Sequence, residues 1–303
     1  MAELYSLLCH PSDEGTLALG DEKAALIDTG MAFCAPEKIE KLRALLGGRP
    51  LDYIIVGHSH YDHIGAIPHI KKVWPDARII CGEHAAAVFS RPSALARIRA
   101  LSQEAARTYR PEAEAAAGDY DDGAFSPDRI VREGDALPLG GLTLRVLETP
   151  GHTRDALSFY LPEHCMLKAD ETLGVLLSPT AMYPVYLVSC RLALESIDKC
   201  AALHPARVWS PHYGEVAPAV AESYFSLARR TVLECRELIL QAHADGCDEA
   251  GILGRFAAKY RTPDLVDKQP EQAFLLNTAA TIRCTLAEYA AGHQGSTSPG
   301  RAI

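Results

Sequence analysis

The chain lacks any apolar run near the ~18 residues that a transmembrane helix requires. Its first residues, MAELYSLLCHPSDEG, have neither the basic start nor the apolar stretch of a signal peptide. An excess of positive charge is also missing, because the formal net charge is −9, whereas nucleic-acid binding favours a basic surface. We therefore expect neither a membrane nor a nucleic acid as partner.

Paired cysteine motifs are absent as well. The chain has nine cysteines, an odd number, and none forms a C-x-x-C pair. Scattered, unpaired cysteines are typical of reduced thiols in an intracellular protein rather than of a disulfide framework. This pattern predicts a cytoplasmic location.

The sequence contains no internal repeat and no G-x-S-x-G motif, so it offers no serine nucleophile of the kind that this motif presents. What it does contain is enough apolar residues, 48% of 303, for a sizeable core. That length and composition predict one large domain, or a domain with an extension.

Short strand-like and helix-like segments alternate in the first part of the chain. The helix-like segments cover residues 36–48 and 67–75, and the apolar strand-like runs are 14–20, 23–30, 51–57 and 77–82. Strands that alternate with helices indicate an α/β layered fold.

Two regions have a helical pattern that no strand-like run interrupts. Residues 84–117 are rich in Ala, Arg and Glu and lead to an acidic turn, which predicts a helical insertion over 84–123. From residue 217 onward the apolar residues recur at helical spacing. We therefore divide the chain into a main domain over 1–216, a helical extension over 217–292 and a disordered tail over 293–303.

The motif GHSHYDHIG at 57–65 concentrates metal-binding side chains directly after an apolar strand. His58 and His60 are two positions apart, whereas Asp62 and His63 are adjacent and can point to different sides. Imidazole and carboxylate are the ligands expected for zinc and related metals. One loop could therefore supply two metal centres.

Two centres need further ligands, and other strand ends offer them. His152 follows a strand and a Pro-Gly turn, Asp170 ends a second strand, and His212 ends a third. Strand ends hold side chains rigidly, which suits a metal site.

The ordered set H-x-H-x-D-H, G-H-T, an aspartate after a strand and a late histidine resembles the metallo-β-lactamase superfamily of hydrolases. The LIDTG segment at 26–30 matches the same family, and the resemblance covers about residues 14–216. It implies a four-layer αββα sandwich. Ala169 and Pro211 stand where the family often has glycine before its ligands.

The resemblance also implies roles for individual residues. The first metal ion would be held by His58, His60 and His152, and the second by Asp62, His63 and His212, with Asp170 bridging them and Asp28 orienting a ligand. The cofactor would be two divalent ions, with zinc as the first choice and iron or manganese as alternatives.

The family chemistry implies a hydrolase in which a metal-bridging hydroxide attacks the substrate while Asp62 orients it and passes a proton to the leaving group. The overall layout resembles glyoxalase II-type and quinolone-signal-response thioesterases, which favours a small acyl ester or thioester. The alternatives are a lactonase or β-lactam hydrolase, a nuclease or phosphodiesterase, and a non-hydrolytic regulator.

The substrate pocket and the assembly are further expectations. We expect Tyr61, Tyr183 and Tyr213 to line the pocket of a small-molecule substrate. The amphipathic C-terminal helices could also pack on a second copy of the chain as a homo-oligomer.

Overall fold

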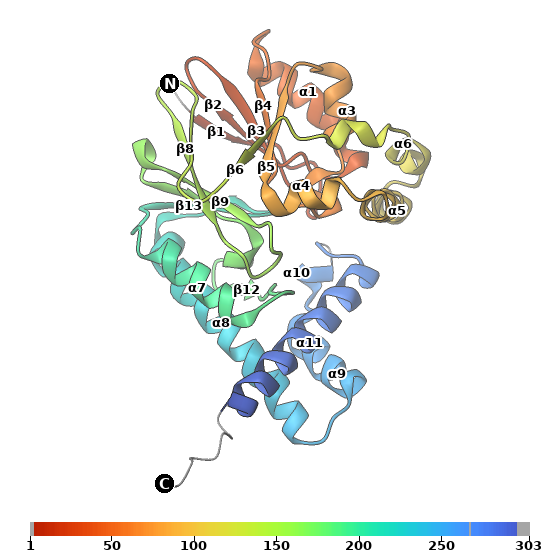
Figure 1. Cartoon of the computed structure of the whole chain (residues 1–303), viewed down its shortest axis with the longest axis vertical. Coiled ribbons are helices and arrows are strands. Elements are labelled where there is room, and N and C mark those ends of the chain that lie inside the picture. Colours follow the sequence, from red (N-terminus) through yellow and green to blue (C-terminus); the bar gives the residue numbers. More distant parts are fainter. Residues whose placement is uncertain (1–2, 267, 296–303) are drawn as a thin grey trace, which may run out of the picture.

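Two six-stranded sheets pack face to face in the computed structural model, with helices on both outer faces (Figure 1). The structure describes residues 3–266 and 268–295. The two packed sheets with helices on both sides confirm the expected four-layer αββα sandwich with helical additions.

The first sheet contains the N-terminal strands in chain order. Strands β1, β2 and β3 are antiparallel neighbours, and β3 to β6 are parallel. The parallel pairs β3–β4 and β4–β5 require crossovers, which α1 (Ala35–Leu46) and the pair α2 (Tyr61–Ile64) and α3 (Ile67–Val73) supply. The strands are β1 (Glu3–Ser6), β2 (Thr16–Leu19), β3 (Ala24–Ile27), β4 (Tyr53–Ile55), β5 (Arg78–Gly82) and β6 (Arg129–Val131).

The second sheet is antiparallel except for one pair of strands. Its order is β14-β13-β10-β9-β8-β7, and β10 pairs with β13 in parallel because α7 (Cys190–Ala201) lies between them in the chain. A separate hairpin joins β11 (Val175–Ser178) to β12 (Ala181–Tyr183). The six strands are β7 (Ala136–Pro138), β8 (Thr143–Glu148), β9 (Leu157–Leu161), β10 (Met166–Lys168), β13 (Arg207–Ser210) and β14 (Gly214–Glu215).

Alternating side chains of the first sheet build two cores. In β3, Leu26 belongs to a core that also contains side chains of α1, α3, α4 (Glu83–Phe89) and α5 (Pro92–Tyr109), whereas Ile27 belongs to the core between the two sheets. In β4, Ile54 belongs to the core under the helices and Ile55 to the core between the sheets. This period of two explains why the strands are apolar throughout, since both of their faces are buried.

The two helical regions lie where the sequence predicts them. The first contains α4 (Glu83–Phe89), α5 (Pro92–Tyr109) and α6 (Glu114–Ala117), and the second α8 (Pro218–Ala244), α9 (Glu249–Tyr260), α10 (Pro263–Val266) and α11 (Glu271–Gly295). Helix α11 continues into the segment expected to be a tail, and residues 296–303 lie outside the described part of the chain.

Figure 1 shows α10 and one end of α11 on the side of the sandwich where α4 and α5 lie. Within the described residues, no helix combines the length and the apolar character that crossing a bilayer requires.

Candidate metal centre

The chemically distinctive side chains gather where several strands end. Asp28 follows β3, and the motif from His58 to His63 follows β4. His152 lies between β8 and β9, while β10 and β13 end just before Asp170 and His212. Loops from both sheets thereby meet at one place, which is how segments far apart in sequence build one site.

Two groups of potential ligands result, and in each the ligand atoms lie within 4.8 Å of one another. The first group is His58, His60 and His152, and the second is Asp62, His63, Glu171 and His212. The two groups touch, because Nε2 of His152 lies 2.9 Å from a carboxylate oxygen of Glu171.

Backbone and carboxylate acceptors fix the orientation of four of the imidazole rings through Nδ1. His152 donates to the carbonyl of Val185 at 2.8 Å and His212 to the carbonyl of Asp13 at 3.0 Å. His63 and His58 donate in the same way to carboxylates, at 3.1 and 2.9 Å. Each of these rings therefore presents Nε2 to the centre, the arrangement by which proteins orient metal-binding histidines.

One of these Nε2 atoms supports a cation site directly. Nε2 of His58 is buried and has no hydrogen-bond partner among the described residues. A buried imidazole nitrogen without a partner is costly unless something binds it. Together with the donor sets, this atom shows that the residues present fit a divalent metal ion.

The carboxylate that lies between the two groups is Glu171, whereas the bridge expected from the sequence is Asp170. Asp170 lies behind His58, 2.9 Å from its Nδ1, and caps the turn Glu171–Leu173 by accepting from the amide of Thr172. Glu171 instead reaches between the two groups, 3.1 Å from Nε2 of His63 and 2.6 Å from Nε2 of His212. The physical reason is that the capping bond turns Asp170 away, while the longer side chain of Glu171 extends inward.

Burial and mutual repulsion favour the uncharged form of two of the three rings in the first group. Burial lowers the pKa of His58 and of His60 well below the usual value, and neighbouring imidazoles lower both further. A neutral imidazole is the form that binds metal. His58 and His60 are thus prepared for a cation. Burial lowers the pKa of His152 as well, but the charge of Glu171 and its hydrogen bond raise it above the usual value.

The pKa values of the two carboxylates in the second group shift in opposite directions. Burial alone would raise the pKa of Glu171, but His152, His212 and His63 lower it well below its usual range. Burial raises the pKa of Asp62 in spite of the nearby His63 and His212. Glu171 is therefore held as an anion, whereas Asp62 binds a proton more readily.

A network of buried charges supports His212. Asp13, Glu14, Lys38 and Lys168 are all buried. Glu14 accepts from the backbone amide of His212 at 2.6 Å and lies 3.5 Å from Nζ of Lys168. Asp13 pairs with Lys38 at 2.8 Å. This network fixes the position of His212 through its backbone amide.

The backbone is strained at two of these residues. Asp28 has φ 56° and His212 has φ 55°, a left-handed conformation that costs about 1–3 kcal/mol for residues other than glycine. Asp28 nevertheless holds both the amide of Gly57 and Nδ1 of His63. The strain at Asp28 is thus maintained by hydrogen bonds that orient the ring of His63.

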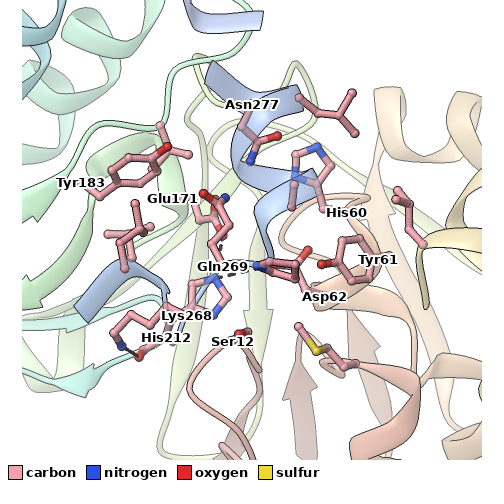
Figure 2. Close-up of a pocket in the computed structure, with 18 of the residues that line it drawn as sticks. Ser12, His60, Tyr61, Asp62, Glu171, Tyr183, His212, Lys268, Gln269 and Asn277 are labelled. Atoms are coloured by element: carbon pink, nitrogen blue, oxygen red, sulfur yellow. Dashed lines mark hydrogen bonds and ion pairs between the residues drawn. The ribbon is translucent and has the colours of Figure 1, made fainter. Parts of the chain in front are cut away.

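A cavity of about 170 Å³, here called the inner cavity, opens beside the second group. Figure 2 shows His60, Asp62, Glu171 and His212 pointing toward it. Helix α5 and the α10–α11 segment cover it with side chains that include Leu101, Leu265, Ala273 and Leu276. Both helical additions therefore shape the site.

Two of the three tyrosines predicted to line the substrate pocket line the inner cavity, and the third does not. Tyr61 and Tyr183 line the inner cavity, as expected. Tyr213 is outside its lining and 39% exposed. The side chain follows His212 directly in sequence but turns toward solvent, so proximity in sequence was misleading.

Sequence reasoning also missed five residues of the site. They are Asp13, Glu14, Lys38, Lys168 and Glu171. A weak signal existed for two of them, because Lys168 is a charge within an apolar strand and Glu171 adjoins a predicted ligand. The other three carry no local pattern.

Comparison with known proteins gives a consistent result. The sequence model of the metallo-beta-lactamase superfamily matches residues 16–212. The hydroxyacylglutathione hydrolase of Rhodopseudomonas palustris is 30% identical over 172 residues, 56% of this chain and 48% of that protein. The acyl-coenzyme A thioesterase MBLAC2 of Gallus gallus is 26% identical over 193 residues, 60% of this chain and 67% of that protein.

Other relatives are similar over less of their length. The nitric oxide reductase of Moorella thermoacetica is 28% identical over 155 residues, which is 51% of this chain and only 32% of that protein. The chain thus spans about a third to two thirds of these relatives.

Solved structures resemble the whole chain. A metallo-beta-lactamase family protein from Thermus thermophilus aligns with a TM-score of 0.59 at 24% identity, covering 95% of this chain and 94% of that one. A stereoselective inverting sec-alkylsulfatase from Pseudomonas sp. aligns with a TM-score of 0.61 at 16% identity, covering 99% and 52%. At these identities the likeness shows the shared fold.

Proposed function

Because the chain belongs to the metallo-beta-lactamase superfamily, a family of metal-dependent hydrolases, we propose that it is a binuclear hydrolase of small acyl thioesters or esters. The observation that carries this proposal is the convergence of two donor groups beside one cavity. Seven side chains from four separate chain segments contribute to them.

Each donor group holds one divalent ion in this proposal. His58, His60 and His152 bind the first, and Asp62, His63 and His212 bind the second. Glu171, rather than Asp170, would be the carboxylate that helps to hold both. Its contacts with His63, His152 and His212 support this role. Zinc suits such nitrogen and carboxylate donors, with iron or manganese as alternatives.

When bound, the two ions supply Lewis acidity and lower the pKa of water at the site. The chain's own residues then orient the reactants. Asp62 lines the cavity and is disposed to take up a proton, because burial raises the pKa of its carboxyl. We assign it the transfer of that proton to the leaving group.

The surroundings of the ions support a small acyl group. The inner cavity, about 170 Å³, is smaller than the ~300–1,000 Å³ of pockets for drug-sized ligands. Apolar side chains such as Met31, Val175 and Val185 line much of it. The thioesterase and the hydroxyacylglutathione hydrolase among the relatives favour a thioester over a cyclic lactone or β-lactam.

We further propose a cytoplasmic location. All nine cysteines are free thiols, the state that a reducing compartment maintains.

The test combines metal analysis with a substrate panel. Purified protein should contain about two divalent ions per chain by elemental analysis. It should hydrolyse acyl thioesters faster than lactones, β-lactams or phosphodiesters. A protein that binds no metal, or that cleaves only a phosphodiester, would refute the proposal.

A further inference from the structure

His60 lies between two separate cavities. It lines the inner cavity, and it also lines a second opening of about 470 Å³, together with His152. We call this second opening the outer groove. It lies between the α4–α5 segment and the loop after His152. The first donor group is therefore accessible from a side that the C-terminal helices leave uncovered.

The outer groove extends well away from the donor groups. It shares His84, Ala87 and Arg154 with a further cavity of about 880 Å³, which reaches the start of α7. The inner cavity, in contrast, is small and covered by α11. A substrate that passes His60 would thus place a small group on one side and a long group on the other.

Two arginines give the outer groove its charge. Arg91 and Arg154 line it and are exposed. Within residues 3–266 and 268–295, neither guanidinium has an ion pair or a hydrogen bond. Most of the exposed arginines elsewhere do have one, for example Arg107 with Glu114 and Arg207 with Glu215.

Among the described residues, the only carboxylate that lines the outer groove is already engaged. Asp155 is buried and accepts from the backbone amide of Ser59 at 2.8 Å. The charged side chains that remain available for a ligand are cationic. In a chain with a net charge of −9, this arrangement favours an anion.

We propose that the outer groove binds the thiol portion of a thioester substrate, and that this portion carries a carboxylate or a phosphate held by Arg91 and Arg154. The inference rests on the proposed function. The acyl group then occupies the inner cavity, with the scissile bond beside His60. Hydrolysis adds water across the carbon–sulfur bond. The oxygen bonds to the acyl carbon, and the sulfur leaves as the thiol with a proton.

The experiment compares three thioesters that share one acyl group. Their thiols are N-acetylcysteamine, which is neutral, glutathione, which carries carboxylates, and coenzyme A, which carries phosphates. The double variant Arg91→Gln with Arg154→Gln should lower kcat/KM for an anionic thioester about tenfold relative to the neutral one. The anionic thioester that responds identifies the source of the anion.

Three controls complete the design. Arg145→Gln changes another exposed, unpaired arginine, which lies on β8 away from both cavities. It should leave unchanged the ratio of kcat/KM for the anionic thioester to kcat/KM for the neutral one. Arg91→Lys with Arg154→Lys should restore most of it. The free thiol that responds should bind the double variant about tenfold more weakly in calorimetry, a readout independent of turnover.

Each other result has a defined meaning. If the ratio is unchanged in the double variant, the outer groove does not bind an anion and the inference fails while the hydrolase proposal stands. If only Arg97→Gln in the inner cavity changes the ratio, the thiol lies on the opposite side and the inference again fails. If the wild type cleaves none of the three, the proposed thioesterase function itself fails.

Discussion

The assignment of the shared carboxylate can be tested by comparing Glu171→Gln with Asp170→Asn. Both changes replace a carboxylate by an amide of the same size. Glu171 lies within 2.6–3.1 Å of the Nε2 atoms of His63, His152 and His212, which belong to both donor groups. Asp170 contacts a single histidine, through the Nδ1 of His58 that faces away from the site.

The expected magnitudes differ because Glu171 lies among the Nε2 atoms of both donor groups, whereas Asp170 lies behind one ring. Removing the charge behind a ligand typically weakens metal affinity about 10–100-fold, or roughly 1.4–2.7 kcal/mol. Asp170→Asn should fall in this range for one ion, since the amide oxygen can still accept from His58. Glu171→Gln should exceed it and affect both ions.

The assay is metal competition against a chelator of known affinity, followed by elemental analysis. Circular dichroism of the chelated proteins controls for folding. If Glu171→Gln retains two ions while Asp170→Asn loses them, Asp170 is the bridge and the reasoning from the geometry is wrong. Glu171→Asp is a matched control, because it keeps the charge but shortens the reach.

Three further predictions concern turnover and stability. Asp62→Asn should lower kcat by about 10²–10⁴-fold at equal metal content; activity near wild type would refute the proton-transfer role. Burial raises the pKa of Glu14, but Lys168 and His212 bring it to about 2, below the usual 4.5. The Glu14 carboxylate should therefore stabilise the fold by about 3 kcal/mol above pH 4.5, and this stabilisation should disappear as pH falls toward 2. Acid titration of the chelated protein should show a smaller loss of folding stability in Glu14→Gln than in the wild type. Equal losses in the two proteins would refute the pKa assignment. Gly30→Ala should lower Tm clearly, because Gly30 has φ 75° and an added Cβ would overlap Asp13 and Lys38; an unchanged Tm would show that the loop adapts.

The sequence was informative wherever a residue's role depends on its near neighbours. The apolar runs predicted the buried strands, because a strand covered on both faces must be apolar at every position. The motif around His58 and His63 predicted metal chemistry, because an ordinary polar loop rarely gathers so many donors directly after one strand. His152 and His212 followed from the same rule of strand ends.

Tertiary structure decided what depends on direction and on distant segments. Asp170 and Glu171 are adjacent carboxylates after the same strand, and only the structure shows that Asp170 bonds to Thr172 and His58 while Glu171 points inward. The pairing of Lys38 with Asp13 joins a helix to a loop through packing that leaves no local pattern.

The same limit applies to the cavities. Part of the cover over the inner cavity comes from α11, more than 200 residues after the strand that leads to the motif. Residue types and their spacing thus determined which chemistry the chain can support, because ligand preference is a property of the side chain. The packed fold determined which donors face one another, because that depends on backbone angles and long-range contacts that spacing does not encode.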